Sequence, residues 1–231
     1  MDFSSVELIT FDCYGTLIDW ETGMLAALRS LFPDHAHISE EKFLSMYGEI
    51  EARLEAGPYL SYRTVLSRTA EEMGRSLGVK LSAEDCQQFA ESLKQWPPFS
   101  DSVESLQALA KHYRLGIISN TDDDLFAASQ KLLQTDFALI VTAQQVQCYK
   151  PSVVNFYEAI KRSGIPKDKI LHAGQSLYHD IAPANILRLR NVWVNRRFGK
   201  QGPGATVAGD AKPGLEVRSL AELAAVMIPA G

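Results

Sequence analysis

Short apolar runs rich in branched residues recur along the chain, and segments of helical period separate them. The runs predict strands at residues 6–11, 115–118, 137–141, 170–173 and 192–194. Apolar positions three and four apart predict helices at residues 103–112, 125–133, 156–163 and 220–226. This alternation is typical of an α/β core, a Rossmann-like parallel sheet covered by helices on both faces. Ligands of such sheets bind beyond the carboxyl ends of the strands.

The pattern changes after the first strand, where only helices are predicted. They fall at residues 24–31, 43–54, 62–77 and 82–93. The Trp96-Pro97-Pro98 sequence then ends the helical region. We therefore expect an all-helical cap domain, residues 19–96, inserted into a core domain of residues 1–18 and 97–231. The Gly-, Pro- and Ala-rich segment 199–214 is expected to be a surface loop.

Length and composition agree with a core that carries an insertion. The chain has 231 residues, roughly one and a half domains at about 150 residues each. Hydrophobic residues make up 46% and charged residues 22%, as in a globular protein. The net charge of −5, without a long basic run, gives no reason to expect a nucleic-acid partner.

The sequence also favours a cytoplasmic protein with no membrane partner. Its apolar stretches are too short to span a bilayer, and the Met-Asp-Phe-Ser start lacks the features of a signal peptide. Three widely spaced cysteines fit a reducing compartment better than a disulfide framework. They are Cys13, Cys86 and Cys148.

Polar side chains follow four of the predicted strands. They are Asp12, Ser119 with Asn120, Lys150, and Asp180 in a loop that also carries Ser176. A carboxylate at this edge can attack an electrophile and form an ester that water hydrolyses, and a nearby lysine holds it ionised. Each residue alone has an ordinary interpretation as a turn or helix cap. Their conjunction on successive elements indicates an active site.

At these residues the chain resembles the haloacid dehalogenase superfamily, over essentially its whole length. The motifs that carry the resemblance are Asp12-Cys13-Tyr14-Gly15-Thr16, Ser119-Asn120, Lys150-Pro151 and the loop that ends in Asp180. The resemblance implies that Asp12 is the nucleophile and that Thr16 and Ser119 position the substrate. It further implies that Lys150 balances charge and that Asp180 acts in the last loop. The helical insertion is similar to the mobile cap of these enzymes.

Two positions separate this chain from the phosphatases of the superfamily. Phosphatases carry an acid two residues after the nucleophile and two acids in the fourth loop that hold Mg²⁺, whereas this chain has Tyr14 and Gln175 there. The motif is instead similar to that of the type II L-2-haloacid dehalogenases, in which aspartate attacks carbon without a metal. We therefore expect no cofactor and no metal site, with Mg²⁺ needed only under a phosphatase alternative.

The same similarity extends to substrate binding. It implies that Ser119 and the backbone N–H groups of Cys13 and Tyr14 bind the substrate carboxylate, and that Asp180 helps activate water. The remaining candidate binding residues are Asn120, Ser176 and Tyr157 in the core and Trp20, Tyr47 and Tyr62 in the helical insertion. Trp20 either walls the pocket or packs at the hinge. His172 is interpreted as a core histidine. For His179, beside Asp180, the ordinary interpretation is a structural residue, and the alternative is an acid, a base or an orienting group.

The arginine with which dehalogenases hold the departing halide is missing. Phe43 stands at its place, Leu177 replaces an asparagine of the fourth loop, and Arg53 is about 15 Å further along its helix at 1.5 Å per residue. Either Tyr47 or Tyr62 donates to the halide, or the leaving group is an amine, as in opening of the strained ring of azetidine-2-carboxylate. An amine leaving group calls for a proton or a carboxylate, which Glu49, Glu51 and Glu55 offer. The more ordinary interpretation of these glutamates is a solvated helix face.

The sequence thus predicts a hydrolase that acts at the 2-carbon of a small 2-substituted carboxylate through an aspartyl ester. Its partner is that small carboxylate, and a homodimer is compatible with the sequence. The alternatives are C–N ring opening by the same aspartate, a Mg²⁺-dependent phosphatase, and a binding module that has kept the fold without the chemistry.

Overall fold

The computed structural model describes residues 3–228. Residues 1, 2 and 229–231 of the predicted core, and the Met-Asp start on which the absence of a signal peptide was judged, lie outside this range. Within it, no helix is both long and apolar enough to cross a bilayer. The three cysteines are unpaired.

A parallel sheet forms the centre of the molecule. In the described residues it has six strands in the order β3-β2-β1-β4-β5-β6. The strands are β1 (Leu8–Phe11), β2 (Arg114–Ser119), β3 (Leu139–Thr142), β4 (Ile170–Gly174), β5 (Arg190–Val194) and β6 (Leu215–Val217). Leu8 of β1 lies opposite Arg114 on one side and Ile170 on the other, so the carboxyl ends of the three central strands meet. Five of these strands were predicted, but β6, only three residues long, was missed.

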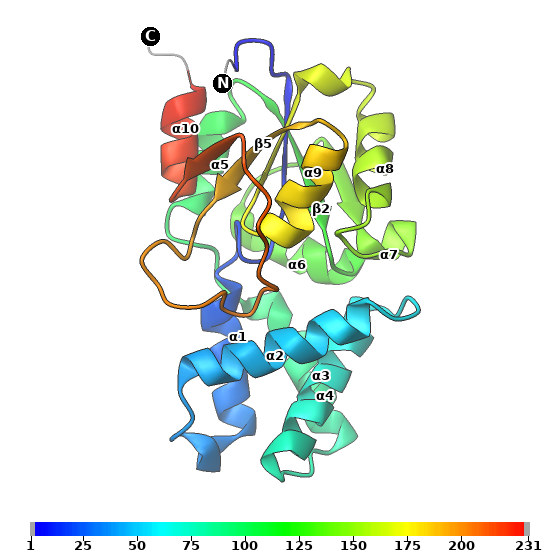
Figure 1. The fold of residues 1–231 in the computed structure, drawn as a ribbon, viewed down its shortest axis with the longest axis vertical. Helices are drawn as coiled ribbons and strands as arrows, with labels where there is room; N and C mark the ends of the chain where they lie inside the picture. Colours follow the sequence, from blue (N-terminus) through cyan, green and yellow to red (C-terminus); the bar gives the residue numbers. More distant parts are fainter. Residues whose placement is uncertain (1–2, 229–231) are drawn as a thin grey trace.

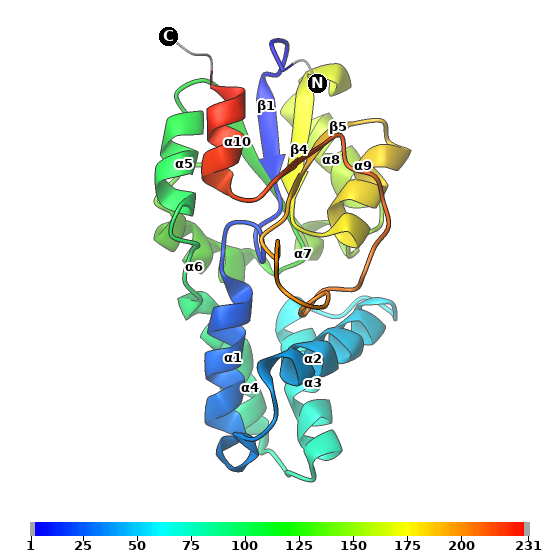
Figure 2. The same ribbon diagram turned by 60° about the vertical axis from the view of Figure 1, so that its left-hand side comes forward.

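Helices cover both faces of the sheet, as the alternation of elements predicts (Figures 1 and 2). They are α5 (Ser102–Leu109), α6 (Asp123–Leu133), α7 (Ala143–Val146), α8 (Val154–Ser163), α9 (Ala182–Ile186) and α10 (Leu220–Met227). Leu8 and Ile9 show how one strand serves both layers. Leu8 belongs to the apolar cluster with Phe156 of α8, and Ile9 to the cluster with Leu106 of α5. Successive strand side chains point to opposite faces, which explains this division.

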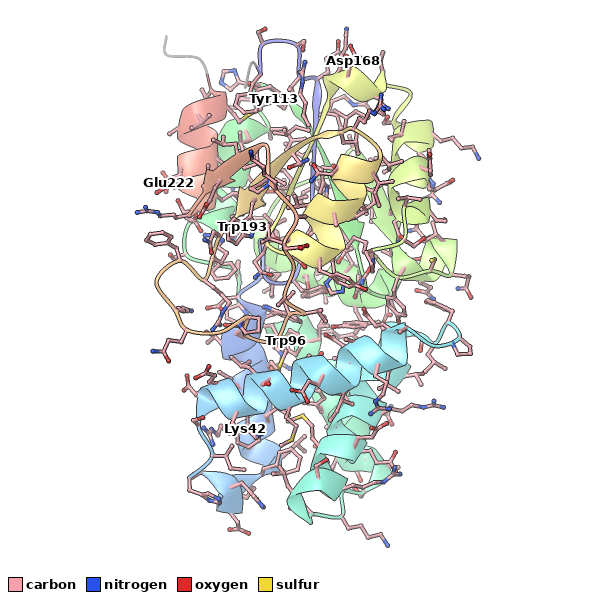
Figure 3. All side chains as sticks on the ribbon, viewed as in Figure 1. Lys42, Trp96, Tyr113, Asp168, Trp193 and Glu222 are labelled. Carbon is pink, nitrogen blue, oxygen red and sulfur yellow. The ribbon has the colours of Figure 1, made fainter. Side chains whose placement is uncertain are left out.

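Four helices between β1 and α5 stand apart from the sheet, at the carboxyl ends of its strands (Figure 1). They are α1 (Trp20–Leu31), α2 (Glu40–Glu55), α3 (Tyr62–Leu77) and α4 (Ala83–Ser92), and we call them the cap. Each of α2, α3 and α4 is preceded by a serine whose side chain accepts a hydrogen bond from a backbone N–H of the first turn. These serines are Ser39, Ser61 and Ser82, respectively. Figure 3 shows Trp96 where the cap meets the core. Its ring packs edge-on against that of Tyr14, with centroids 6.2 Å apart.

The segment 199–214 is a largely exposed loop, as predicted, and it also contacts the cap. Figure 2 shows it running from β5 down to the cap before it returns to β6. Ala205 is 1% exposed, and its backbone N–H donates to Glu21 Oε1 at 3.2 Å. Gly48 of α2 allows this approach, because a Cβ there would lie 2.6 Å from the Ala205 carbonyl oxygen.

Candidate active site

Asp12 lies directly after the central strand β1, in a tight turn. Its Oδ1 accepts a hydrogen bond from Lys150 Nζ at 2.8 Å, and its Oδ2 accepts one from Thr16 Oγ1 at 2.7 Å. Gly15 makes the turn possible with a φ of +88°, and a Cβ there would lie 2.9 Å from Trp20 Nε1. Burial raises the pKa of Asp12, and the Lys150 charge opposes this effect. The aspartate is therefore a fixed, nearly buried carboxylate facing the cap.

Lys150, from the loop after β3, holds the centre of the site. Its ammonium donates to Asp12 Oδ1, to Asp180 Oδ1 at 2.7 Å and to the Ile118 carbonyl oxygen at 3.0 Å. These three bonds use all three of its protons. Burial lowers the pKa of Lys150, but the two carboxylates raise it by more, so the net pKa is above its ordinary value and the ammonium stays charged. One buried cation thus lies between two aspartates.

Asp180 is held on every side. Oδ1 accepts from Lys150 and contacts His172 Nε2 at 3.3 Å, and Oδ2 accepts from the Ser176 backbone N–H at 3.1 Å. Gly174 leaves room for it, since a Cβ there would lie 2.4 Å from Asp180 Cγ. Burial raises the pKa of Asp180, but Lys150 and His172 lower it well below its usual range.

A cavity of about 50 Å³ separates these residues from the cap. The predicted residues that line it are Asp12, Tyr14, Trp20, Tyr62, Ser119, Asn120, Lys150, Ser176 and Asp180. Ser119 Oγ is buried and has no hydrogen-bond partner among the described residues, which leaves it available to a ligand. Likewise, within residues 3–228 no acceptor is recorded for the backbone N–H groups of Cys13 and Tyr14.

Thr16 and Tyr157 are predicted residues that do not line the cavity, and Tyr14 lines it without presenting its hydroxyl to it. Thr16 is buried beneath the nucleophile, where it also accepts from the Gln175 backbone N–H at 2.9 Å. Tyr157 is 58% exposed on α8 and does not line the cavity. Tyr14 lines the cavity, but its hydroxyl lies 3.0 Å from Ser129 Oγ in the core.

Asn120 braces the loop of Lys150 and also contacts the cap. Its Oδ1 accepts from the Lys150 backbone N–H at 2.7 Å, and its Nδ2 donates to the Lys150 carbonyl oxygen at 3.1 Å. The same Nδ2 donates to Glu55 Oε2 at 3.2 Å. The amide is therefore already occupied on both sides, which favours a positioning role over direct contact with a substrate.

Two cap glutamates line the cavity, contrary to the prediction of a solvated helix face. Glu51 Oε1 accepts from the hydroxyls of Tyr47 and Tyr62, at 2.7 Å each. Burial raises the pKa of Glu51 to about 7, although both phenols lower it. Burial and the charge of Glu51 raise the pKa of Glu55 well above its usual range. Of the three glutamates considered, Glu49 alone is exposed.

These contacts also correct one explanation for the missing arginine. Tyr47 and Tyr62 direct their hydroxyls at Glu51, so neither phenol is free to donate to a halide. Phe43 is fully buried against Phe32 in the cap, and Arg53 pairs with Glu72 on the surface. Among the residues that line the cavity, Lys150 is the one lysine or arginine.

Some residues of the cavity were not among the expected catalytic and binding residues, although two glutamates and a histidine among them were considered for acid–base roles. They are Glu51, Glu55, Gln175, His179 and Thr206. The glutamates had a signal in the sequence, because they continue at intervals of four the stripe begun by the buried Phe43 and Tyr47. Thr206 had none, since it comes from the loop after β5.

The donor set does not suit the Mg²⁺ ion that phosphatases of the superfamily use. The Lys150 ammonium occupies the Oδ1 atoms of Asp12 and Asp180, and Gln175 offers an amide where a second acid would be needed. Across residues 3–228, no cluster of three or more histidine, cysteine or acidic side chains is arranged to hold a metal ion.

A carboxylate after the central strand of a parallel sheet, paired with a lysine beneath a helical cap, defines the class of hydrolases to which the sequence pointed. Residues 6–186 match the family model of the haloacid dehalogenase-like hydrolases, and the chain belongs to that family. It is therefore a haloacid dehalogenase-like hydrolase.

Individual relatives agree over nearly the full chain. The (S)-2-haloacid dehalogenase of Pseudomonas putida is 26% identical over 223 residues, 95% of each chain, and that of Pseudomonas fluorescens is 25% identical over the same share. The L-2-haloacid dehalogenase of Xanthobacter autotrophicus superposes with a TM-score of 0.81 at 16% identity, over 96% of this chain and 98% of that one. A structure of that enzyme with chloropropionic acid covalently bound gives a TM-score of 0.80 at 15% identity, over the same shares.

Proposed function

We propose that the protein hydrolyses a bond at the 2-carbon of a small 2-substituted carboxylate, and that Asp12 is the nucleophile. The observation that carries the proposal is the pair of hydrogen bonds that fixes the Asp12 carboxylate. Thr16 and Lys150 leave one carboxylate oriented toward a cavity large enough for several heavy atoms. The full-length similarity to (S)-2-haloacid dehalogenases supports the substrate class.

The reaction has two steps. An oxygen of Asp12 forms a bond to the 2-carbon while the leaving group departs with its bonding electrons, which inverts that carbon and creates an aspartyl ester. Water then attacks Cγ of Asp12, and the bond between Cγ and the transferred oxygen breaks. The product is a 2-hydroxy acid whose new oxygen comes from Asp12. The substrate carboxylate is bound by Ser119 Oγ and by the backbone N–H groups of Cys13 and Tyr14.

A single-turnover reaction in ¹⁸O-water tests the covalent step, with enzyme in excess over (S)-2-chloropropanoate or azetidine-2-carboxylate. The product of the first turnover is expected to carry unlabelled oxygen, and Asp12 to gain the label. The Asp12→Asn variant is the control and is expected to form no product. First-turnover product that is fully labelled by solvent would contradict the proposal.

A nitrogen leaving group is a second candidate, which the acidic cavity favours. Asp12, Asp180, Glu51 and Glu55 line the cavity against one lysine. A departing halide gains nothing from carboxylates, whereas a departing nitrogen gains a proton from a carboxyl whose pKa is raised, as those of Glu51 and Glu55 are. Opening of a strained ring such as azetidine-2-carboxylate meets this requirement.

Two substrates and one variant separate the candidates. If nitrogen leaves, Glu55→Gln is expected to lower kcat for azetidine-2-carboxylate by about 10²-fold, the lower range for loss of a general acid. If halide leaves, (S)-2-chloropropanoate is the better substrate and the same variant changes its turnover little. Glu49→Gln, on the exposed side of the same helix, is the matched control.

Three further expectations belong to this proposal. The enzyme works without a cofactor, it resides in the cytoplasm, and a homodimer is compatible with it. The magnesium phosphatase alternative is disfavoured by the donor set, and the binding-module alternative by the complete Asp12, Lys150 and Asp180 constellation.

A further inference from the structure

The second step of the proposed reaction needs a base for the attacking water, and Asp180 is poorly suited to be that base. Both of its oxygens already accept hydrogen bonds, from Lys150 and from the Ser176 backbone N–H, and His172 Nε2 contacts Oδ1. Its pKa lies well below the usual range. Asp180 is therefore already engaged in fixing Lys150 and the turn at Ser176.

His179 lies one residue before Asp180 and lines the same cavity as Asp12. It is partly exposed there, in a single π-helical turn over Leu177–Ile181. Single turns of this kind often occur at functional sites. Ser176 Oγ accepts from the His179 backbone N–H at 2.9 Å and lies 3.2 Å from its Nδ1. Nε2 forms no hydrogen bond with any residue of the described range.

The groups around the imidazole leave it neutral. Burial lowers the pKa of His179 to about 4, Asp180 raises it and Lys150 lowers it. A neutral imidazole with Nδ1–H donated to Ser176 Oγ presents the lone pair of Nε2 as a base. The serine can accept both bonds, because a hydroxyl oxygen has two lone pairs.

Water can reach this position. A second cavity, about 480 Å³, lies between α2 of the cap and the loops after β3 and β4. His179, Glu55 and Lys150 line both cavities, so the imidazole lies where the larger cavity meets the catalytic one.

We propose that His179 is the general base that activates the water for hydrolysis of the aspartyl ester, with Asp180 fixing Lys150. The inference rests on the proposed function. Water attacks Cγ of Asp12 and gives one proton to His179 Nε2. The Cγ–O bond to the product then breaks, and the imidazolium returns that proton to the product alkoxide. The second water proton stays on the new Asp12 carboxyl and passes to solvent when Asp12 ionises again beside Lys150.

The cap carboxyls are placed for the opposite task. Glu51 and Glu55 come from α2, on the side of the cavity away from the strand that carries Asp12, and their raised pKa values keep a proton available. His179 comes from the core loop next to Asp12. Groups whose environments push their pKa values in opposite directions divide naturally into acid and base.

Rapid quench and intact mass spectrometry of a His179→Gln variant test the proposal, with (S)-2-chloropropanoate and azetidine-2-carboxylate as probes. Glutamine keeps a polar side chain but cannot take up a proton. The Asp12 ester is expected to form at nearly the wild-type rate and to accumulate, with its hydrolysis slowed about 10²-fold or more. His112→Gln, the same change at an exposed histidine of the core, is the matched control and is expected to leave both steps unchanged.

The outcomes are distinct. An ester that forms in His179→Gln and breaks down at the wild-type rate overturns the role of His179 and leaves the covalent mechanism intact. No ester in any variant, with solvent oxygen in the first-turnover product, overturns the covalent mechanism and this inference with it. If the variant does not fold, ¹⁵N NMR of the wild-type imidazole decides. A proton on Nδ1 supports the proposal, and a neutral ring with its proton on Nε2 overturns it.

Discussion

The carboxylate of Asp122 in the core caps the first turn of a helix in the cap, at Tyr62. Its Oδ1 accepts from the Tyr62 backbone N–H and its Oδ2 from that of Arg63, both at 2.9 Å. Asp122 is 1% exposed. A buried anion at the N-terminus of α3 satisfies otherwise unpaired donors and complements the helix dipole. This contact fixes α3, and with it the Tyr62 hydroxyl, over the catalytic cavity.

Replacing Asp122 by alanine is expected to destabilise the protein by about 2 kcal/mol, because two charge-assisted hydrogen bonds are lost. The melting temperature should then fall by about 5 °C for a chain of this size. KM should rise, since the cap is held less firmly. Asp136→Ala, at an exposed aspartate of the core, is the control for calorimetry and kinetics. Unchanged melting temperature and KM in Asp122→Ala would contradict this role.

Lys150→Met should leave two buried aspartates without their shared cation. We expect a loss of about 3–5 kcal/mol of stability and a fall in kcat of at least about 10³-fold. Lys161→Met removes a lysine that is 80% exposed on α8 and should change neither quantity. Denaturant unfolding and steady-state assays measure both. Wild-type activity in Lys150→Met would show that Asp12 needs no counter-charge.

The raised pKa of Glu51 leads us to expect that the free energy of unfolding depends on pH. Its pKa is about 7 in the folded protein against an ordinary value of 4.5, so the folded state binds more protons between these values. The contribution of Glu51 to the free energy of unfolding is therefore complete below pH 4.5 and is lost as the pH rises through 7.

Glu51→Gln is expected to raise the melting temperature relative to wild type at pH 8, and much less at pH 5. The difference between the two pH values is on the order of 3 kcal/mol at most, from 1.36 kcal/mol per pKa unit. Thermal unfolding across this range measures it, with Glu49→Gln as the control on the same helix. A difference that does not vary with pH would mean that Glu51 titrates normally.

The exposed position of Tyr157 predicts that it contributes little to catalysis. Tyr157→Ala is expected to change kcat/KM by less than about twofold, because the ring makes no contact with the cavity. Tyr62→Phe removes a hydrogen bond to Glu51 and should lower kcat/KM. The same assay serves both variants, and a large loss in Tyr157→Ala alone would reverse the assignment.

Removal of divalent metal ions by a chelator should not change the activity. Since Lys150 occupies the carboxylate oxygens that would bind Mg²⁺, kcat/KM is expected to be the same with EDTA and with added Mg²⁺. Activity on a phosphate ester that EDTA abolishes would instead favour the phosphatase alternative.

The order of the strand-end motifs was enough to predict the core of the site. Strands that alternate with helices pair in parallel, so residues that follow β1, β2, β3 and β4 meet at one edge wherever the loops are short. Asp12, Lys150 and Asp180 met as expected for this reason. The cap was also predicted as a helical insertion, because its apolar positions follow the helical period and prolines end it.

Only the tertiary structure decided which cap residues face Asp12 across the cavity. Whether Glu51 and Glu55 point to water or to the nucleophile depends on how α2 packs against the core, and periodicity within one helix cannot specify that. The exposure of Tyr157 and the reach of segment 199–214 to Gly48 depend on the same docking. Local sequence thus determined which groups gather at the sheet edge, while contacts between distant segments determined that the cavity is acidic. Burial against the core also raises the pKa values of Glu51 and Glu55, so these carboxyls hold protons that they would lose if they were solvated.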